Sequence, residues 1–580
     1  MPLSSLPAPG AHGLSLALLQ ALWSGGVREF VLAPGSRSAP LALALHRADA
    51  VGDVRLHVRV DERSAGFLAL GLAKGSRRPV AVVTTSGTAV GNLLPAVMEA
   101  HHTGVPLVVV SADRPERLRG TGANQTTLQA GIFGPFAACH DLRSSDSPEA
   151  LAAAAGSACV AAGPTQLNLQ LDGDLMPSEA DPATWWVRPL PGPSGSLRAN
   201  PENPELSRHS ELNPRANPEN PELSRSERGP LTLDPGPRTV VVAGDGAGPA
   251  ARLLAEAGNW PLLAEPTSGA RVGRQAIRAY RLLLGGPLRA EIDRVIVVGH
   301  PTLSRPVTSL ISDPALEVLA VRDRSGTATD PGRVARVLDA VPTLADSPTP
   351  SGVQNGSDWF DRWRAADDAL SARIDAYVAQ RPGSPLALAA VVADAVTPHT
   401  SLVLGSSNVI RDLDVMATPW TPHEHRFVVG NRGLAGIDGT VSTAVGIALG
   451  RPGASRTIAY LGDLTFLHDT NGLLIGPDEP RPDITFVVLN DDGGAIFAGL
   501  EQGGTPYESA FERVFGTPHG TDLAALCRAH GIEHETITEP ERLATALRSE
   551  PSGIRLIEVP VSRADRRAEA ERLRELARPE

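Results

Sequence analysis

Short apolar runs alternate along this chain with longer stretches in which apolar residues recur at helical spacing. Strands that alternate with helices in this way pair in parallel, because each helix carries the chain back to the start of the next strand. The pattern therefore predicts an α/β fold of doubly wound parallel sheets. The predicted strands are residues 29–32, 80–84, 106–111, 239–243, 294–298, 316–321, 401–404, 426–429, 457–461, 484–489 and 555–559.

Two stretches break this alternation and divide the chain into three α/β domains. Residues 186–235 are rich in Pro, Asn, Ser and Glu, and the segment 198–208 is repeated identically at 215–225. Such a composition cannot bury a core, which indicates a linker or surface insertion. Residues 343–355 form a second, turn-rich linker. The predicted domains are residues 1–185, 236–342 and 356–580, and the tail 562–580 is predicted to be a charged helix.

The turns after two predicted strands carry the strongest chemical signal. Gly462 and Asp463 follow the first of these strands, and Asn490, Asp491 and Gly493 follow the second. A strand–helix–strand crossover fits between Asp463 and Asp491, so both turns can face one crevice at the edge of a parallel sheet. The two carboxylates and the Gly493 carbonyl are hard oxygen ligands, which suits a Mg²⁺ ion that holds a diphosphate.

This spacing resembles the signature of thiamine-diphosphate enzymes. The resemblance implies that thiamine diphosphate is the cofactor and that Gly462 and Leu464 contact it. It also implies that Asp463, Asp491 and the Gly493 carbonyl hold Mg²⁺ or Mn²⁺, two ions that oxygen ligands suit equally. Relatives more often have asparagine where this chain has Asp491.

Two further cofactor residues are implied by the same resemblance. Glu62 matches the glutamate that ends a strand of the first domain and exchanges a proton with the aminopyrimidine ring. Ile437 matches the bulky aliphatic residue that bends the cofactor into a V. In this superfamily the domain that carries Glu62 faces the domain that carries Asp463 in another subunit. The resemblance therefore implies a homodimer or homotetramer.

Seven short blocks in a matching order narrow the resemblance further. They are residues 33–38, 61–63, 85–89, 112–115, 122–125, 431–433 and 493–497. Together they resemble the family of 2-succinyl-5-enolpyruvyl-6-hydroxy-3-cyclohexene-1-carboxylate (SEPHCHC) synthases of menaquinone biosynthesis. The family reaction decarboxylates 2-oxoglutarate and adds the resulting succinyl-semialdehyde carbanion to isochorismate.

Both of these substrates are dicarboxylates, and guanidinium groups bind carboxylates through paired hydrogen bonds. The arginines in matching blocks are Arg37, Arg114, Arg305, Arg411 and Arg432. The family also implies three polar positioning residues and an apolar wall that favours decarboxylation by excluding water. The polar residues are Ser36, Gln125 and Ser407, and the wall consists of Ile496, Phe497 and Leu500.

Composition limits the remaining choices. The net charge of −12 and the pI near 5.7 argue against nucleic acid as a partner, which requires a basic face. Three cysteines, at positions 139, 159 and 527, lack metal-like or redox spacing and suit small buried residues in a reducing compartment. We find no signal peptide and no apolar run that spans a bilayer, so a cytoplasmic protein is expected. Lys74 is the only lysine among 53 basic residues. Arginine is therefore common throughout the chain, and a lone arginine is weak evidence for a binding site.

Two alternatives remain open on the sequence. One is a different thiamine-diphosphate enzyme, either an acetohydroxyacid synthase or a simple 2-oxoacid decarboxylase. The other is a non-catalytic nucleotide-binding regulatory protein, for which the glycine-rich residues 242–248 are the candidate loop. That loop lacks the Gly-x-Gly-x-x-Gly spacing, and its Gly244-Asp245-Gly246 is followed by no Asn-Asp turn at the required distance, so we interpret it as a structural turn.

Overall fold

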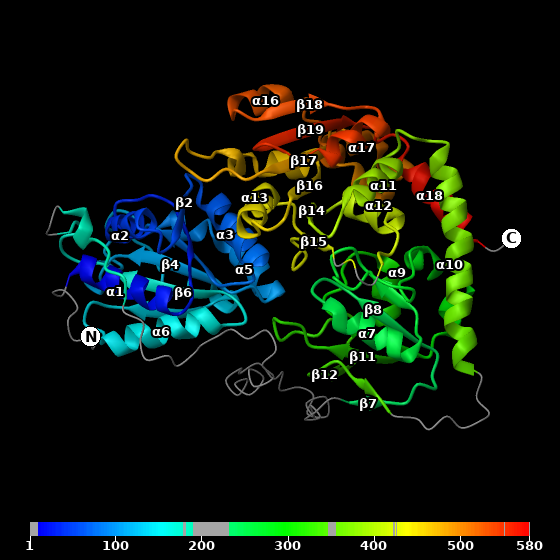
Figure 1. The fold of residues 1–580 in the computed structure, drawn as a ribbon, viewed down its shortest axis with the longest axis horizontal. Helices are drawn as coiled ribbons and strands as arrows, with labels where there is room; N and C mark the ends of the chain where they lie inside the picture. The colour runs from blue at the N-terminus through cyan, green and yellow to red at the C-terminus, as the bar shows by residue number, and fades with distance from the viewer. Residues whose placement is uncertain are drawn as a thin grey trace.

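Three parallel sheets with helices between their strands make up the computed structural model of the chain (Figure 1). The structure describes residues 10–177, 181–189, 231–345, 355–421, 424, 426–549 and 551–578. The α/β fold predicted from the sequence is therefore confirmed. Most of the predicted linker 186–235, including its duplicated segment, lies outside the described residues, as do residues 346–354 of the second predicted linker.

The amino-terminal sheet has the strand order β2-β1-β3-β4-β6-β5, with every neighbouring pair parallel. The order reverses between β1 and β3, so the loops that follow these two strands face one crevice. Its strands are β1 (Glu29–Leu32), β2 (Arg55–Val58), β3 (Val80–Thr84), β4 (Leu107–Asp113), β5 (Ala138–Leu142) and β6 (Thr165–Gln170). Its helices are α1 (Ala11–Ser24), α2 (Ala39–Ala50), α3 (Glu62–Ser76), α4 (Thr88–Gly91), α5 (Leu94–Thr103) and α6 (Pro148–Val160).

The middle sheet has the order β12-β11-β10-β8-β9, and a separate pair joins β13 to β7. Strand β7 lies at the end of the predicted linker 186–235, and β13 lies at the start of the predicted linker 343–355. The sequence prediction had placed no strand in either linker. The strands are β7 (Thr232–Leu233), β8 (Thr239–Ala243), β9 (Leu262–Ala264), β10 (Arg294–Val298), β11 (Glu317–Val321), β12 (Arg336–Leu338) and β13 (Thr343–Leu344). The helices are α7 (Gly248–Gly258), α8 (Tyr280–Leu283) and α9 (Arg305–Ile311).

The carboxyl-terminal sheet has the order β15-β14-β16-β17-β19-β18, which reverses between β14 and β16. The long helix α10 precedes it and runs beside the middle domain (Figure 1), where the Trp359 indole donates to the Thr239 carbonyl at 2.9 Å. The strands are β14 (Thr400–Leu404), β15 (Phe427–Gly430), β16 (Arg456–Gly462), β17 (Ile484–Asn490), β18 (Glu533–Thr536) and β19 (Ile554–Pro560). The helices are α10 (Asn355–Ala379), α11 (Pro385–Ala395), α12 (Asn408–Met416), α13 (Thr440–Gly450), α14 (Asp463–His468), α15 (Glu508–Phe511), α16 (Leu523–Ala529), α17 (Pro540–Arg548) and α18 (Arg566–Leu576).

Helices α3 and α13 pack together and join the amino-terminal domain to the carboxyl-terminal one (Figure 1). Their side chains belong to one continuous apolar core that includes the inner faces of both sheets. Glycines permit the close approach: a Cβ on Gly71 would lie 2.2 Å from the Thr443 carbonyl oxygen, and a Cβ on Gly446 would lie 2.3 Å from that of Leu68. The helix backbones are therefore in direct contact.

The structure differs from the sequence prediction at several points. It adds β2, β5, β6, β9, β12 and β18, most of which carry charged or amide side chains that hide their strand pattern. Strand β2 ends at Val58, so Glu62 is the first residue of α3 and does not end a strand. Cys139 is exposed, contrary to the expectation, whereas Cys159 and Cys527 are buried. Among the described helices, we find none with the length and apolar character needed to cross a membrane.

We expect Gly446→Ala to destabilise the protein by about 2 kcal/mol, because the new methyl group must push two packed backbones apart. The measurement is the shift of the first urea-unfolding transition. Gly156→Ala in α6 is the matched control, since nothing lies within 4 Å of its added Cβ. The control should stabilise α6 by roughly 0.5–1 kcal/mol, and an equal gain in both variants would contradict the close packing.

Candidate active site

The turn after β16 and the turn after β17 lie side by side. Strands β16 and β17 are paired in parallel register, with Gly462 opposite Leu489. Asp463 is buried, and its Oδ2 accepts a hydrogen bond from the Gly493 amide at 2.8 Å. The two turns that the sequence singled out therefore form one site at the carboxyl edge of the sheet, where the strand order reverses.

The donor set at this edge fits a divalent cation. Asp491 Oδ1 is buried without a hydrogen-bond partner. Burial is the largest cause and repulsion from Asp463 the next, and they raise the pKa of Asp491 to about 7. Among the described residues no cluster of three or more His, Cys, Asp or Glu side chains has metal-binding geometry. A cation here would therefore complete its shell with the Gly493 carbonyl, phosphate oxygens and water.

Gly493 and His519 shape the same turn. Gly493 has a φ of +145° and packs so closely that a Cβ would lie 1.9 Å from the Gly516 carbonyl oxygen. His519 Nδ1 accepts from the Thr521 amide at 2.9 Å, so the neutral ring carries its proton on Nε2, which lies 3.1 Å from Asp463 Oδ2. Sequence reasoning missed His519, because no motif surrounds it.

The loops after β1, β3 and β4 bring the amino-terminal candidates together. The Arg37 amide donates to Thr85 Oγ1 at 3.3 Å, and Gly35 packs directly on the same threonine. Arg114 Nη2 donates to the Asn124 carbonyl at 2.6 Å, next to the exposed Gln125. Burial, together with the nearby charge of Arg114, lowers the pKa of Arg37. Two guanidinium groups and exposed Ser36 thus share this edge.

Glu62 is half-buried at the start of α3, one residue after the helix cap. The Asp61 carboxylate caps α3 by accepting from the Arg63 and Ser64 amides. Glu62 Oε2 accepts a hydrogen bond from Asn92 Nδ2 at 3.2 Å. The cap is therefore supplied by Asp61, which leaves the Glu62 carboxylate for another role.

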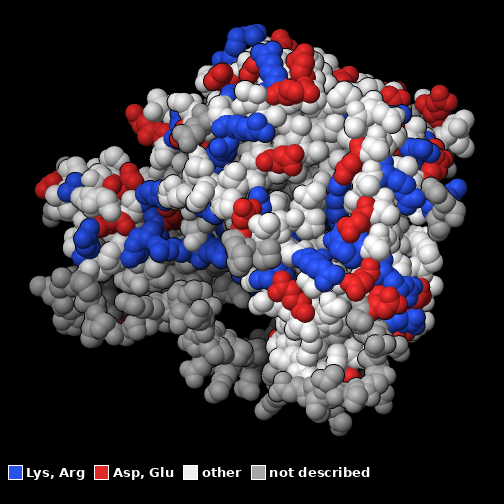
Figure 2. Space-filling view, turned by 45° about the vertical axis from the view of Figure 1, so that its right-hand side comes forward, with Lys and Arg blue, Asp and Glu red and all other residues white. Residues whose placement is uncertain are grey.

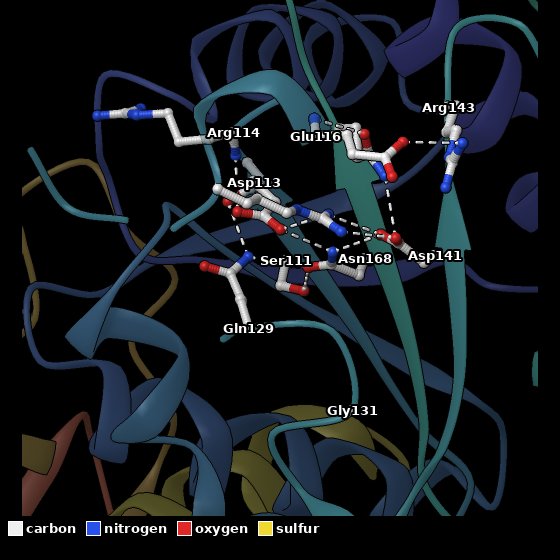
Figure 3. A network of polar contacts seen from close by, with 12 residues as sticks. Ser111, Asp113, Arg114, Glu116, Gln129, Gly131, Asp141, Arg143 and Asn168 are labelled. Carbon is white, nitrogen blue, oxygen red and sulfur yellow. Dashed lines mark hydrogen bonds and ion pairs between the residues drawn. The ribbon is translucent and has the colours of Figure 1, made fainter. Parts of the chain in front are cut away.

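A buried polar network holds the loop that carries Arg114 (Figure 3). Asn168 donates to Asp113 at 2.9 Å and to Asp141 at 2.7 Å, and its oxygen accepts from Ser111 and Gln129, each at 2.9 Å. Arg119 bridges the same two aspartates. In Figure 3 the Arg114 side chain points away from this network, so the network fixes the backbone, while the guanidinium bonds the Asn124 carbonyl.

The carboxyl-terminal arginines lie where this domain meets the middle domain. Arg432 is buried and donates to Ser406 Oγ at 3.3 Å and to Thr302 Oγ1 at 2.9 Å. Arg411 donates to the Ser407 carbonyl at 2.7 Å. Burial, with the nearby charges of Arg432 and Arg281, lowers the pKa of Arg411 to about 10. The guanidinium groups of Arg411 and Arg432 therefore concentrate positive charge in a region of low dielectric.

Two adjoining cavities of about 550 and 540 Å³ open beside these arginines. Ile496 lines the first and Arg305 the second, and both are lined by Arg411 and Leu500 as well as by Arg281, which sequence reasoning missed. Their size is that of ordinary small-molecule sites. Helix α18 lines the first. Basic and acidic side chains are interspersed on the right-hand side of the molecule in Figure 2.

Not every candidate reaches these cavities. Arg305 does line the second cavity, but it is exposed there and forms an ion pair with Glu501 at 2.6 Å. Phe497 stacks near Phe515 and lines neither cavity, and Ile437 lies half-buried in the loop before α13. None of the amino-terminal candidates lines either cavity: Ser36, Arg37, Glu62, Arg114 and Gln125. Within one chain the amino-terminal candidates thus lie outside the two cavities that Arg411 lines.

Backbone strain is a signal in these loops that sequence reasoning did not use. Four of the non-glycine residues with positive φ lie in candidate loops: Gln125, Ser407, Ala435 and Asp492. Such conformations cost about 1–3 kcal/mol each and persist where the surrounding structure enforces them, often at functional sites. The strain therefore coincides with the loops that the sequence motifs selected.

Comparisons with known proteins agree with this geometry. Residues 14–132 match the amino-terminal thiamine pyrophosphate binding domain of thiamine pyrophosphate enzymes, and residues 414–559 match the carboxyl-terminal one. A benzoylformate decarboxylase from Polynucleobacter necessarius superposes with a TM-score of 0.61 at 18% identity, covering 96% of this chain and 99% of that one, which supports the fold. Fold and site together define a thiamine pyrophosphate enzyme.

Two relatives narrow the class to one family. A SEPHCHC synthase from Nocardioides sp. is 48% identical over 98% of this chain and 99% of its own length. Another, from Paenarthrobacter aurescens, is 45% identical over 98% of this chain and 97% of its own. The chain belongs to the 2-succinyl-5-enolpyruvyl-6-hydroxy-3-cyclohexene-1-carboxylate synthase family, as its sequence motifs predicted.

We expect Asn168→Leu to destabilise the protein by about 2–4 kcal/mol, because it leaves buried partners on Ser111, Asp113 and Gln129 unsatisfied. Urea unfolding of the purified protein measures the change. Arg117→Ala, which removes an exposed pair with Asp172 in the same loop, should cost less than about 0.5 kcal/mol. Comparable losses in the two variants would show that the network adds no more than a surface contact.

Proposed function

We propose that this protein is a thiamine-diphosphate-dependent transferase that decarboxylates 2-oxoglutarate and adds the remaining four-carbon unit to isochorismate. The product is SEPHCHC, an intermediate of menaquinone biosynthesis. Membership of the family supports the proposal, since relatives of nearly the same length carry the name of this reaction. The observation that carries it is the buried Asp463 beside the half-buried Asp491, whose buried Oδ1 has no hydrogen-bond partner.

Asp463, Asp491 and the Gly493 carbonyl would hold Mg²⁺ or Mn²⁺, and Gly462 and Leu464 would contact the diphosphate. When bound, thiamine diphosphate supplies an electron sink that makes decarboxylation of a 2-oxoacid possible. The repulsion between the two neighbouring carboxylates supports this role, because a divalent cation between them would remove it. Asp491 serves as well as the asparagine of many relatives, since its oxygens are also hard ligands.

Glu62 is the proposed acid–base residue. Its role is to exchange a proton with the aminopyrimidine ring of the cofactor, while Ile437 supports the bend between the two rings. The position of Glu62 supports this role, because the Asp61 side chain already caps α3 and Asn92 holds the Glu62 carboxylate at 3.2 Å.

The arginines are proposed to bind the carboxylates of the two substrates, with Ser36, Gln125 and Ser407 as polar positioning residues. Arg37 and Arg114 lie close together at the carboxyl edge of the amino-terminal sheet, and Arg411 lines both cavities. Arg432 and Arg305 complete the set. Ile496, Phe497 and Leu500 would form the apolar wall that excludes water from the reacting carbon.

The active site is proposed to assemble between two copies of this chain, in a homodimer or homotetramer. The separation of the amino-terminal candidates from the cavities supports this arrangement. Large apolar side chains are exposed beside the candidate loops, which indicates a surface that another molecule covers. They are Val60, Leu128, Leu434 and Leu474. A cytoplasmic location is proposed as well, supported by three free cysteines.

The proposal predicts that the purified protein consumes 2-oxoglutarate only when isochorismate, thiamine diphosphate and Mg²⁺ are all present. The measurement is a two-substrate assay, with EDTA and cofactor omission as controls. Preference for pyruvate over 2-oxoglutarate would favour an acetohydroxyacid synthase or a simple 2-oxoacid decarboxylase. Failure to bind thiamine diphosphate in calorimetry would favour a regulatory protein.

We expect Glu62→Gln to lower turnover by roughly a hundredfold or more, the range for loss of a general acid–base group. The amide cannot exchange the proton, yet it keeps the size of the side chain, so unfolding and metal binding should stay close to those of the wild type. Glu116→Gln, at an exposed glutamate paired with Arg143, is the control. Near-normal turnover of Glu62→Gln would remove the acid–base assignment.

A further inference from the structure

The only lysine of the chain is buried between two domains. Lys74 lies near the end of α3, and its side chain is 7% exposed. Its Nζ donates to the Gly430 carbonyl at 2.8 Å, to Asn431 Oδ1 at 3.3 Å and to Glu99 Oε1 at 3.3 Å. The ammonium group of an amino-terminal helix therefore binds the loop after β15 in the carboxyl-terminal domain.

Glu99 holds the next residues of the same loop. Its carboxylate, on α5, accepts from the Gly433 amide through Oε1 and from the Leu434 amide through Oε2, each at 2.9 Å. The space is tight, because a Cβ on Gly433 would lie 3.0 Å from Glu99 Oε2. Lys74 neutralises a carboxylate that is itself buried, so the pair acts as one clamp on residues 430–434.

The geometry explains why this position holds a lysine in a chain whose other basic residues are arginines. Three acceptors on separate groups converge on one nitrogen, and an ammonium group offers three donors around a point. A guanidinium group presents its donors in a rigid planar fork, which suits paired carboxylate oxygens and not three converging acceptors. Lys74 is thus specified by the arrangement of its partners.

The clamped loop is the one that leads to Arg432 and Ile437. Arg432 extends in the opposite direction to Ser406 and Thr302, and Asn431 Nδ2 donates to Thr443 Oγ1 of α13 at 3.0 Å. The loop is therefore held from all three domains. Of these anchors, Lys74 and Glu99 are the two that come from the amino-terminal domain of the same chain.

We propose that Lys74 and Glu99 are positioning residues that fix the loop 430–437, and through it Arg432 and Ile437, for cofactor binding. This inference rests on the proposed function for the identity of the cofactor. The restraint on the loop does not depend on that identity, so the two are separable by experiment. Neither residue is proposed to touch the substrate or the cofactor.

The test compares Lys74→Met, Lys74→Arg and Glu99→Gln with the wild type in two measurements. Hydrogen exchange of the apoprotein reports the protection of the Gly433 and Leu434 amides. Calorimetry reports the affinity for thiamine diphosphate in the presence of Mg²⁺. Arg278→Met is the matched control, because it removes a buried cation that pairs with Asp375 far from this loop.

We expect all three variants to exchange faster over residues 430–437 and to bind thiamine diphosphate about ten- to a hundredfold more weakly, the range for loss of a hydrogen bond to a charged group. Lys74→Arg keeps the charge, so its failure to restore either value isolates the geometry of the donors. Arg278→Met should lower the unfolding midpoint without either effect.

Unchanged loop exchange in Lys74→Met and Glu99→Gln would overturn the proposed restraint. Faster exchange with wild-type cofactor affinity would also overturn it, because the loop would then move without consequence for the cofactor. If the wild type itself fails to bind thiamine diphosphate, the proposed function is wrong, and the exchange data alone then decide whether Lys74 and Glu99 hold the loop.

Discussion

The backbone contact between α3 and α13 is the constraint on which the arrangement of the candidate site depends. Helix α3 starts at Glu62 and bears Lys74 near its end, and α13 follows directly on the loop that contains Ile437. Because glycines bring the two helices into contact, a shift of either helix moves residues of both domains together. Two domains that are distant in sequence are thereby held as one body, with a shared apolar core behind the site.

Charge is distributed unevenly over the domains described above. The buried carboxylate of Asp463 lies near the half-buried carboxylate of Asp491, whereas the cavities between the middle and carboxyl-terminal domains are lined by Arg281 and Arg411. Buried like charges are unfavourable in the absence of a counter-charge. The protein thus has one site that favours a cation and another that favours anions. This combination suits a metal-bound diphosphate and dicarboxylate substrates.

Motifs and buried strands could be predicted from the sequence, because each depends on neighbouring residues. The interior strands other than β6 and the turns at Asp463 and Asp491 are of this kind, whereas β6 was missed because amide side chains interrupt its apolar pattern. Strands such as β18, with the sequence Glu-His-Glu-Thr, could not, since their place in the sheet is set by partners far along the chain. His519 and the clamp of Lys74 and Glu99 were missed for the same reason, because their partners are remote in sequence.

The division of the candidates within one chain follows from the topology. In each sheet the candidate loops lie at the carboxyl ends of the strands, near the point where the strand order reverses. The α3–α13 contact fixes the angle between these edges of the amino-terminal and carboxyl-terminal sheets. Arg37 and Arg114 accordingly line neither cavity within one chain. In the proposed oligomer a second copy of the chain would present the missing edge, and the exposed Val60 and Leu128 lie beside that edge. Association would then bury apolar surface and complete the site in one step.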